Sequence, residues 1–222
     1  MKLTRLEFIY GSKANDRQND ELIMQRECRI MRETSFITEY VLQKLSKENF
    51  FDVRSIFFYF ARWDSRGKEI TEYDKIMWVA TPFGDEYFDL GRTERVKFIV
   101  EMLRYGFKKV FSYKGWDYAV VGDILDGIPD DFCENVFYSR QRCSANGYRA
   151  KVKCIHTMYE AKWIIEVYKG RKLIKESLPY IMGRPDAFMF GFYIKRLTYD
   201  EKYGFSLSCD LMKMRLTSVK IN

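Results

Sequence analysis

Histidine is almost absent from the 222-residue sequence, which contains only His156. Zinc sites of the His-Glu-x-x-His type place two imidazoles on one face of a helix, so a single histidine cannot form them. The five cysteines are odd in number and include no Cys-x-x-Cys pair, which argues against a disulfide framework and against a cysteine-based zinc site. We therefore expect no metal ligands and a reducing, cytoplasmic location.

Glycine patterns that bind phosphate are also missing. Neither Gly-x-x-x-x-Gly-Lys-Ser/Thr nor Gly-x-Gly-x-x-Gly occurs, which disfavours ATP-driven and nicotinamide chemistry because those patterns let backbone amides approach phosphate. The apolar stretches fall far short of the roughly 20 residues that span a bilayer. The first ten residues alternate charged with apolar side chains, unlike a signal peptide. We expect no cofactor, no membrane association and no secretory address.

Aromatic and basic residues are plentiful. The chain has 18 Phe, 16 Tyr and 4 Trp, with 47% apolar and 31% charged residues, which is the balance of a folded soluble protein. Many aromatic residues with only 4 Pro favour sheet-rich structure, because aromatic side chains fit a pleated surface. The net charge of +7 modestly favours an anionic partner, although the basic residues are spread along the chain.

Hydrophobic periodicity predicts an α+β fold, an antiparallel sheet or meander packed by two main helices. The helices are expected at about 19–47 and 93–111, the second with Gly115 just beyond its end. Residues 51–60 and 73–81 suggest a long hairpin, and residues 116–121 a strand. The strand-rich C-terminal half is expected to form strands at 148–158, 161–168, 172–178, 187–197 and 204–216. Strands in one run and helices in another argue against a doubly wound nucleotide-binding fold.

The domain organisation follows from composition. No Pro/Ser/Gly-rich linker interrupts the chain, so we predict one composite domain over residues 1–222. The alternative is a division near residue 146, with an α+β part at 1–146 and an antiparallel β part at 147–222.

Two local patterns carry weak chemical signals. Cys154 and His156 lie two residues apart on a predicted strand, so both point to one face, as a nucleophile and its base would. A buried cysteine and a hydrogen-bonded histidine are the favoured interpretation. Residues 122–127 resemble a calcium loop but lack oxygen ligands at alternate positions, so we interpret them as an acidic, turn-rich loop.

A third pattern resembles the metal-dependent nuclease superfamily. Pro129 and Asp130 are followed by Glu160 and Lys162 in the order Pro-Asp…Asp/Glu-x-Lys. The resemblance implies that Asp130 and Glu160 hold Mg²⁺ while Lys162 helps to activate water. On a strand, Glu160 and Lys162 would share a face.

Aromatic residues beside arginines invite a nucleic-acid interpretation, in which bases stack on the rings. The first such set is Phe57, Tyr59, Trp63, Tyr73 and Trp78 beside Arg54, Arg62 and Arg66; the second is Trp163, Tyr168, Phe188, Phe190, Phe192 and Tyr193. Both faces of residues 57–60 are apolar, which favours a core strand over a stacking platform. Members of the second set would fill a core or anchor a partner protein.

With no dominant catalytic signature, we expect a non-enzymatic protein-binding module. As a small, aromatic-rich α+β protein without catalytic motifs, it resembles in general character the immunity proteins, which neutralise bacterial toxins by direct binding. The resemblance implies a protein partner and a one-to-one complex that persists in high salt, because desolvated aromatic contacts resist screening. The alternative is a magnesium-dependent nuclease or nucleic-acid-binding protein that acts through Asp130, Glu160 and Lys162.

Overall fold

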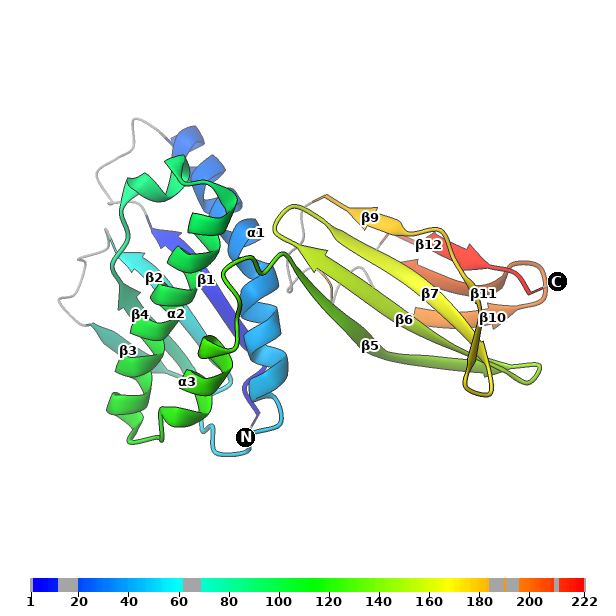
Figure 1. The fold of residues 1–222 in the computed structure, drawn as a ribbon, viewed down its shortest axis with the longest axis horizontal. Helices are drawn as coiled ribbons and strands as arrows, with labels where there is room; N and C mark the ends of the chain where they lie inside the picture. The colour runs from blue at the N-terminus through cyan, green and yellow to red at the C-terminus, as the bar shows by residue number, and fades with distance from the viewer. Residues whose placement is uncertain are drawn as a thin grey trace. The chain divides into compact units, whose positions relative to one another are not determined.

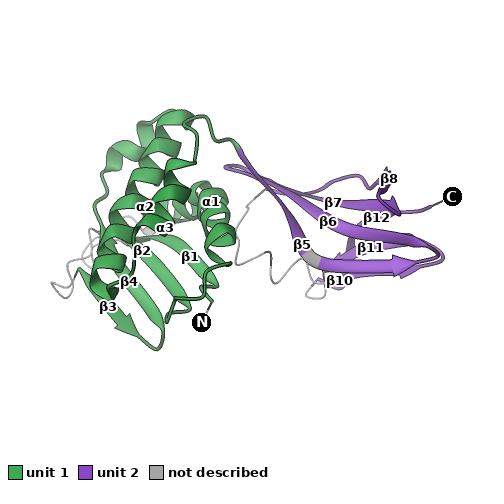
Figure 2. Ribbon diagram, turned by 60° about the horizontal axis from the view of Figure 1, so that its bottom comes forward, with its two compact units in different colours: residues 1–133 green, residues 134–222 purple. Residues whose placement is uncertain are grey.

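The computed structural model describes residues 2–11, 20–61, 69–183, 190, 196–209 and 212–221. The chain divides into two compact units, Met1–Cys133 and Glu134–Asn222, called here the N-terminal and C-terminal units (Figures 1 and 2). The division after residue 133 lies ahead of the alternative expected near residue 146. The single-domain interpretation stays a prediction.

The N-terminal unit is a four-stranded sheet with helices on one of its faces (Figures 1 and 2). The strands lie in the order β1-β2-β4-β3, where β1, β2 and β4 are parallel and β3 is antiparallel to β4. Their bounds are β1 (Arg5–Gly11), β2 (Ser55–Ala61), β3 (Ile70–Tyr73) and β4 (Ile76–Thr81). The helices are α1 (Asp20–Leu45), the 3₁₀ helix η2 (Asp85–Asp89), α2 (Arg92–Lys114) and α3 (Ala119–Asp126).

Helix α2 forms where the apolar periodicity predicted it. Val96, Val100, Leu103 and Phe107 are buried on one face of the helix, and Gly115, with a φ of 68°, ends it in the left-handed conformation. A Cβ at Gly106 would lie 2.3 Å from Cε1 of Phe58, so the lack of a side chain lets α2 approach β2 this closely.

Three local expectations for this unit are wrong. Strands β2 and β4 are parallel neighbours, not the two arms of a hairpin; the hairpin joins the short β3 to β4. Residues 119–126 form the helix α3, which includes part of the segment expected to be a strand. The same helix takes up most of the acidic segment 122–127, which is therefore not a loop that could wrap calcium.

The C-terminal unit consists of two antiparallel sheets. The larger follows the order β5-β6-β7-β8, with β9 also paired to β7, and the smaller follows β10-β11-β12. The strands are β5 (Glu134–Ala145), β6 (Tyr148–Thr157), β7 (Ala161–Lys169), β8 (Lys172–Glu176), β9 (Tyr180–Met182), β10 (Arg196–Asp200), β11 (Gly204–Cys209) and β12 (Met214–Val219). Asn146 and Gly147, with φ of 50° and 76°, form the tight turn between β5 and β6.

The core of this unit lies between the two sheets. Trp163 and Ile165 of β7 and Val152 of β6 pack in one cluster with Phe205 and Leu207 of β11. The meander is confirmed in β6, β7 and β8, whereas residues 204–216 form two strands and β5 was missed. Most of the strand expected at 187–197 lies outside the described residues.

The α+β class and the two main helices are confirmed. In the part of the chain that the structure describes, no helix has an apolar stretch long enough for a membrane span.

Candidate functional site

The three residues of the nuclease-like pattern belong to different units. Asp130 lies in the N-terminal unit, where its carboxylate is 2.9 Å from Nζ of Lys97. Glu160 and Lys162 lie in the C-terminal unit and pair with each other, with 2.8 Å between Oε1 and Nζ. Among the described residues, no group of three or more His, Cys, Asp or Glu side chains is arranged to hold a metal ion. A magnesium role for Asp130 and Glu160 stays a prediction.

Cys154 and His156 share a face of β6, as strand alternation requires. Both are fully buried, Cys154 in the core cluster and His156 beside Phe190, with 5.0 Å between ring centroids. Burial disfavours the charged imidazolium and lowers the pKa of His156 to about 3. The imidazole is therefore neutral near pH 7, and neither side chain is exposed to a substrate.

The first aromatic set lies partly on the face of the N-terminal sheet that the helices leave uncovered. Phe58 contacts Phe107 of α2, so its strand neighbours Phe57 and Tyr59 point the other way. Phe57 stacks on Trp78 with 4.5 Å between centroids and is only 5% exposed. Because the Phe57 and Trp78 rings stack on each other, little ring area is left on which a nucleic-acid base could stack. Tyr73 is exposed; Arg62, Trp63 and Arg66 lie outside the described residues.

The second aromatic set is divided between core and surface. Trp163 and Phe190 are buried and contact each other. Tyr168 lies on the opposite face of β7 from the core, where its hydroxyl donates a hydrogen bond to Glu166. That bond and burial both raise the pKa of Tyr168. Phe188, Phe192 and Tyr193 lie outside the described residues.

A buried charge network joins the helical elements of the N-terminal unit. The Glu33 carboxylate, on α1, is 1% exposed. It accepts hydrogen bonds from Arg29 Nε at 2.9 Å, from Arg95 Nη1 at 3.1 Å and from the Tyr87 hydroxyl at 2.9 Å. Burial and the neighbouring carboxylate raise the pKa of Tyr87. Tyr87 of η2 and Arg95 of α2 both donate to this one buried carboxylate of α1, so the network ties the three elements together and offers no open site.

Exposed apolar side chains follow one edge of the larger C-terminal sheet. We call this set the edge surface: Leu173 and Ile174 of β8, Leu178 in the connection, and Ile181 of β9. Leu178 is 84% exposed and Ile181 52%. All five residues of β8 are exposed, although consecutive side chains point to opposite faces. Both faces of β8 are therefore open.

The backbone beneath the edge surface is well anchored. The Leu178 carbonyl accepts hydrogen bonds from Thr217 Oγ1 at 2.7 Å and from Ser177 Oγ at 2.9 Å. The Ser177 hydroxyl also accepts one from the Ile165 amide at 2.9 Å. Leu178 is thus held in an exposed position by its own main chain.

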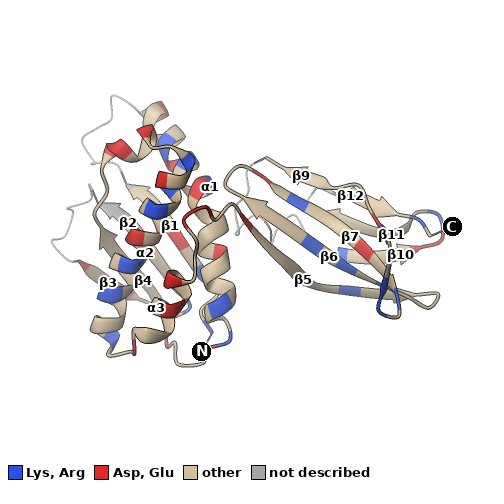
Figure 3. Cartoon of the chain, viewed as in Figure 1, with Lys and Arg blue, Asp and Glu red and all other residues tan. Residues whose placement is uncertain are grey.

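Basic residues accompany this edge. Arg171 in the turn before β8, and Lys172 and Lys175 within it, are exposed, and Glu176 is the acidic residue of the strand. Elsewhere in both units, basic and acidic residues are interspersed along the helices and strands (Figure 3). A lysine-rich edge strand resists pairing with identical edges, since like charges repel.

Comparison with protein-family models, with curated proteins and with solved structures finds no match for this chain. We therefore infer function from the geometry of the chain itself. Sequence reasoning missed the edge surface, although the signal was present: Leu173 and Ile174 are adjacent apolar residues between lysines, which is unlike a strand with one buried face.

Proposed function

We propose that this protein is a non-enzymatic protein-binding module and that the edge surface contacts its partner. The single observation that carries the proposal is the exposure of Leu173, Ile174, Leu178 and Ile181 along one sheet edge. Single apolar residues scattered over a surface need no explanation, but four of them gathered along one sheet edge favour a binding surface there.

Strand addition is the binding mode that this edge favours. In β-augmentation, a partner strand pairs with the free edge of a sheet, and exposed side chains on either side supply specificity. Strand β8 pairs with β7 on one side and has both faces open. A partner strand beside β8 would cover Leu173 on one face and Ile174 on the other.

The hydrogen-bonded backbone at Leu178 favours a high affinity for the partner protein. Ordering a mobile loop on binding costs free energy, and a surface already held in its bound conformation avoids that loss. The two hydrogen bonds to the Leu178 carbonyl provide such an anchor.

The charges of the edge favour a partner with acidic residues beside its apolar ones. Arg171, Lys172 and Lys175 exceed the single Glu176 of the strand, and charge complementarity accelerates encounter and rejects unsuitable partners. A bacterial toxin neutralised by direct binding is the partner that the general resemblance to immunity proteins suggests.

The test is affinity capture from the native cells in high salt, followed by calorimetry with the recovered protein. The wild type is compared with Leu178→Asp, and with Leu22→Asp as the matched control, because Leu22 is an exposed leucine of the N-terminal unit. We expect a one-to-one complex that persists in high salt. Leu178→Asp should weaken it by at least about tenfold, since a buried unpaired carboxylate costs more than 1.4 kcal/mol.

The control should bind as the wild type does. If no protein is captured, or if Leu178→Asp binds as tightly as Leu22→Asp, the proposal fails. Both substitutions lie at exposed positions, where the expected change in unfolding free energy is within about 0.5 kcal/mol, so misfolding would not account for a loss.

A further inference from the structure

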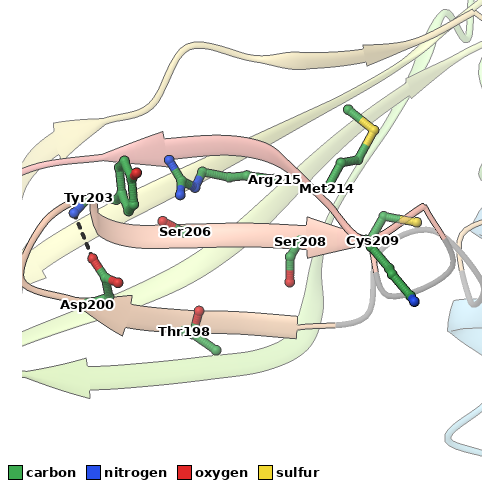
Figure 4. Close-up of a pocket in the computed structure, with 9 residues that line it drawn as sticks. Thr198, Asp200, Tyr203, Ser206, Ser208, Cys209, Met214 and Arg215 are labelled. Atoms are coloured by element: carbon green, nitrogen blue, oxygen red, sulfur yellow. Dashed lines mark hydrogen bonds between the residues drawn. The ribbon is translucent and has the colours of Figure 1, made fainter.

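A polar depression of about 390 Å³ lies on the outer face of the smaller C-terminal sheet. Its floor carries small hydroxyl side chains, Thr198 of β10 with Ser206 and Ser208 of β11 (Figure 4). Phe205 and Leu207 alternate with these serines and belong to the core cluster, so the serines point away from the core. A hydroxyl-lined hollow on the outside of a sheet is suited to a polar ligand.

One of these hydroxyls lacks a partner. Ser206 is only 7% exposed, and its Oγ has no hydrogen-bond partner among the described residues. Buried hydroxyls in proteins are nearly always hydrogen-bonded, and one left unpaired destabilises the folded state. The cost is offset if a ligand oxygen accepts the hydroxyl proton.

The cations at the depression also lack carboxylate partners. Neither Arg215 nor Lys213 forms an ion pair in the part of the chain that the structure describes. Arg215 is a residue of β12, and its guanidinium carbon lies 3.3 Å from the centre of the Tyr203 ring (Figure 4). The Tyr203 ring covers one face of the Arg215 guanidinium, so the N–H groups around the guanidinium edge remain able to donate hydrogen bonds. The one lining carboxylate, Asp200, accepts a hydrogen bond from the Tyr203 amide at 2.8 Å.

We propose that this depression binds the phosphate group of a small molecule. Arg215 would donate to two phosphate oxygens, Lys213 would add a second positive charge, and the Ser206 hydroxyl would donate to a third oxygen. Arginine with serine and threonine hydroxyls forms a typical phosphate-binding set, because all of them donate hydrogen bonds. The proposal does not depend on the edge surface, which lies on the other sheet.

The experiment is calorimetric titration of the full chain with inorganic phosphate and with phenyl phosphate, at constant ionic strength in chloride. The variants are Arg215→Gln and Ser206→Ala, with Arg149→Gln as a matched control because it removes the same charge from an exposed position of β6. Arg215→Gln should weaken binding by about tenfold or more, since it removes charge-assisted hydrogen bonds. Arg149→Gln should leave the affinity unchanged.

Ser206→Ala gives the more specific signature. It should weaken phosphate binding by about threefold, the loss of one modest hydrogen bond, while it raises the urea midpoint of the ligand-free protein, because it removes an unpaired buried hydroxyl. This variant tests the proposal even if Arg215→Gln does not fold. Equal affinities for the two ligands would identify the phosphate group alone as the ligand, and tighter phenyl phosphate binding would add a contact with Met214 at the rim. No binding, equal losses in Arg215→Gln and Arg149→Gln, or unchanged binding in Ser206→Ala would each overturn the proposal.

Discussion

Acidification should destabilise the C-terminal unit through one buried side chain. His156 is fully buried, and desolvation lowers its pKa from 6.5 to about 3. The unfolded chain exposes the imidazole, which then takes up a proton near its ordinary pKa. Below pH 6.5 the unfolded state therefore binds more protons than the folded state, and the free energy of unfolding falls as the pH falls, until about pH 3.

The loss of unfolding free energy follows from the shift in the pKa of His156. Each pKa unit corresponds to about 1.36 kcal/mol. At pH 5 the unfolded imidazole is almost fully protonated while the folded one is neutral, so the loss relative to pH 7.5 is about 2 kcal/mol. At pH 3 it reaches about 4 kcal/mol, which is a large share of the whole stability of many domains.

The assay is urea unfolding at pH 7.5 and pH 5.0, for the wild type and His156→Leu. Fluorinated tryptophan resolves the units by NMR, because Trp163 is the one tryptophan of the C-terminal unit among the 4 in the chain. We expect the wild type to lose about 2 kcal/mol more than His156→Leu between the two pH values. His156→Gln is a second non-titrating variant and should behave as His156→Leu does. Equal losses in all three proteins would refute the reasoning from burial.

Three further predictions concern packing, the charge network and catalysis. Gly106→Ala should reduce the free energy of unfolding by about 1–3 kcal/mol despite a better helix propensity, because the new methyl would meet the Phe58 ring; unchanged urea unfolding would show that α2 shifts freely. Glu33→Ala should cost about 2–4 kcal/mol, because it leaves half-buried Arg95 without its carboxylate and the buried Tyr87 hydroxyl without its acceptor; thermal unfolding measures this, and a change below about 1 kcal/mol would contradict it. Plasmid DNA and total RNA should stay intact with Mn²⁺; cleavage that Lys162→Ala and Glu160→Ala both abolish would establish the nuclease alternative instead.

Some elements of the fold are visible in the sequence and others are not, for physical reasons. Helix α2 was predictable because its apolar residues recur at helical spacing and Gly115 ends it. The supposed hairpin was wrong because β3 has only four residues, none of them buried, and so lacks the alternation that marks a strand. Strand β5 was missed because polar residues such as Arg142 and Ser144 fill much of it.

The sites were harder to predict than the fold. The sequence suggested residues 204–216 as one strand, so Ser208 and Arg215 were not expected to pair with each other on two neighbouring strands. The exposure of β8 is a result of tertiary packing, which the residue pattern of a single strand does not reveal. His156 shows the opposite case: its favoured interpretation as a residue inside the sheet structure agrees with its burial, and the hydrogen bond expected of it stays a prediction.

The central claim is that the edge surface is where a partner protein binds. The most direct measurement is hydrogen exchange of backbone amides with and without the captured partner. The account predicts slower exchange at residues 172–182 in the complex, strongest along β8, because its free amides would pair with a partner strand. Unchanged exchange in this segment, with protection confined to other parts of the chain, would contradict it.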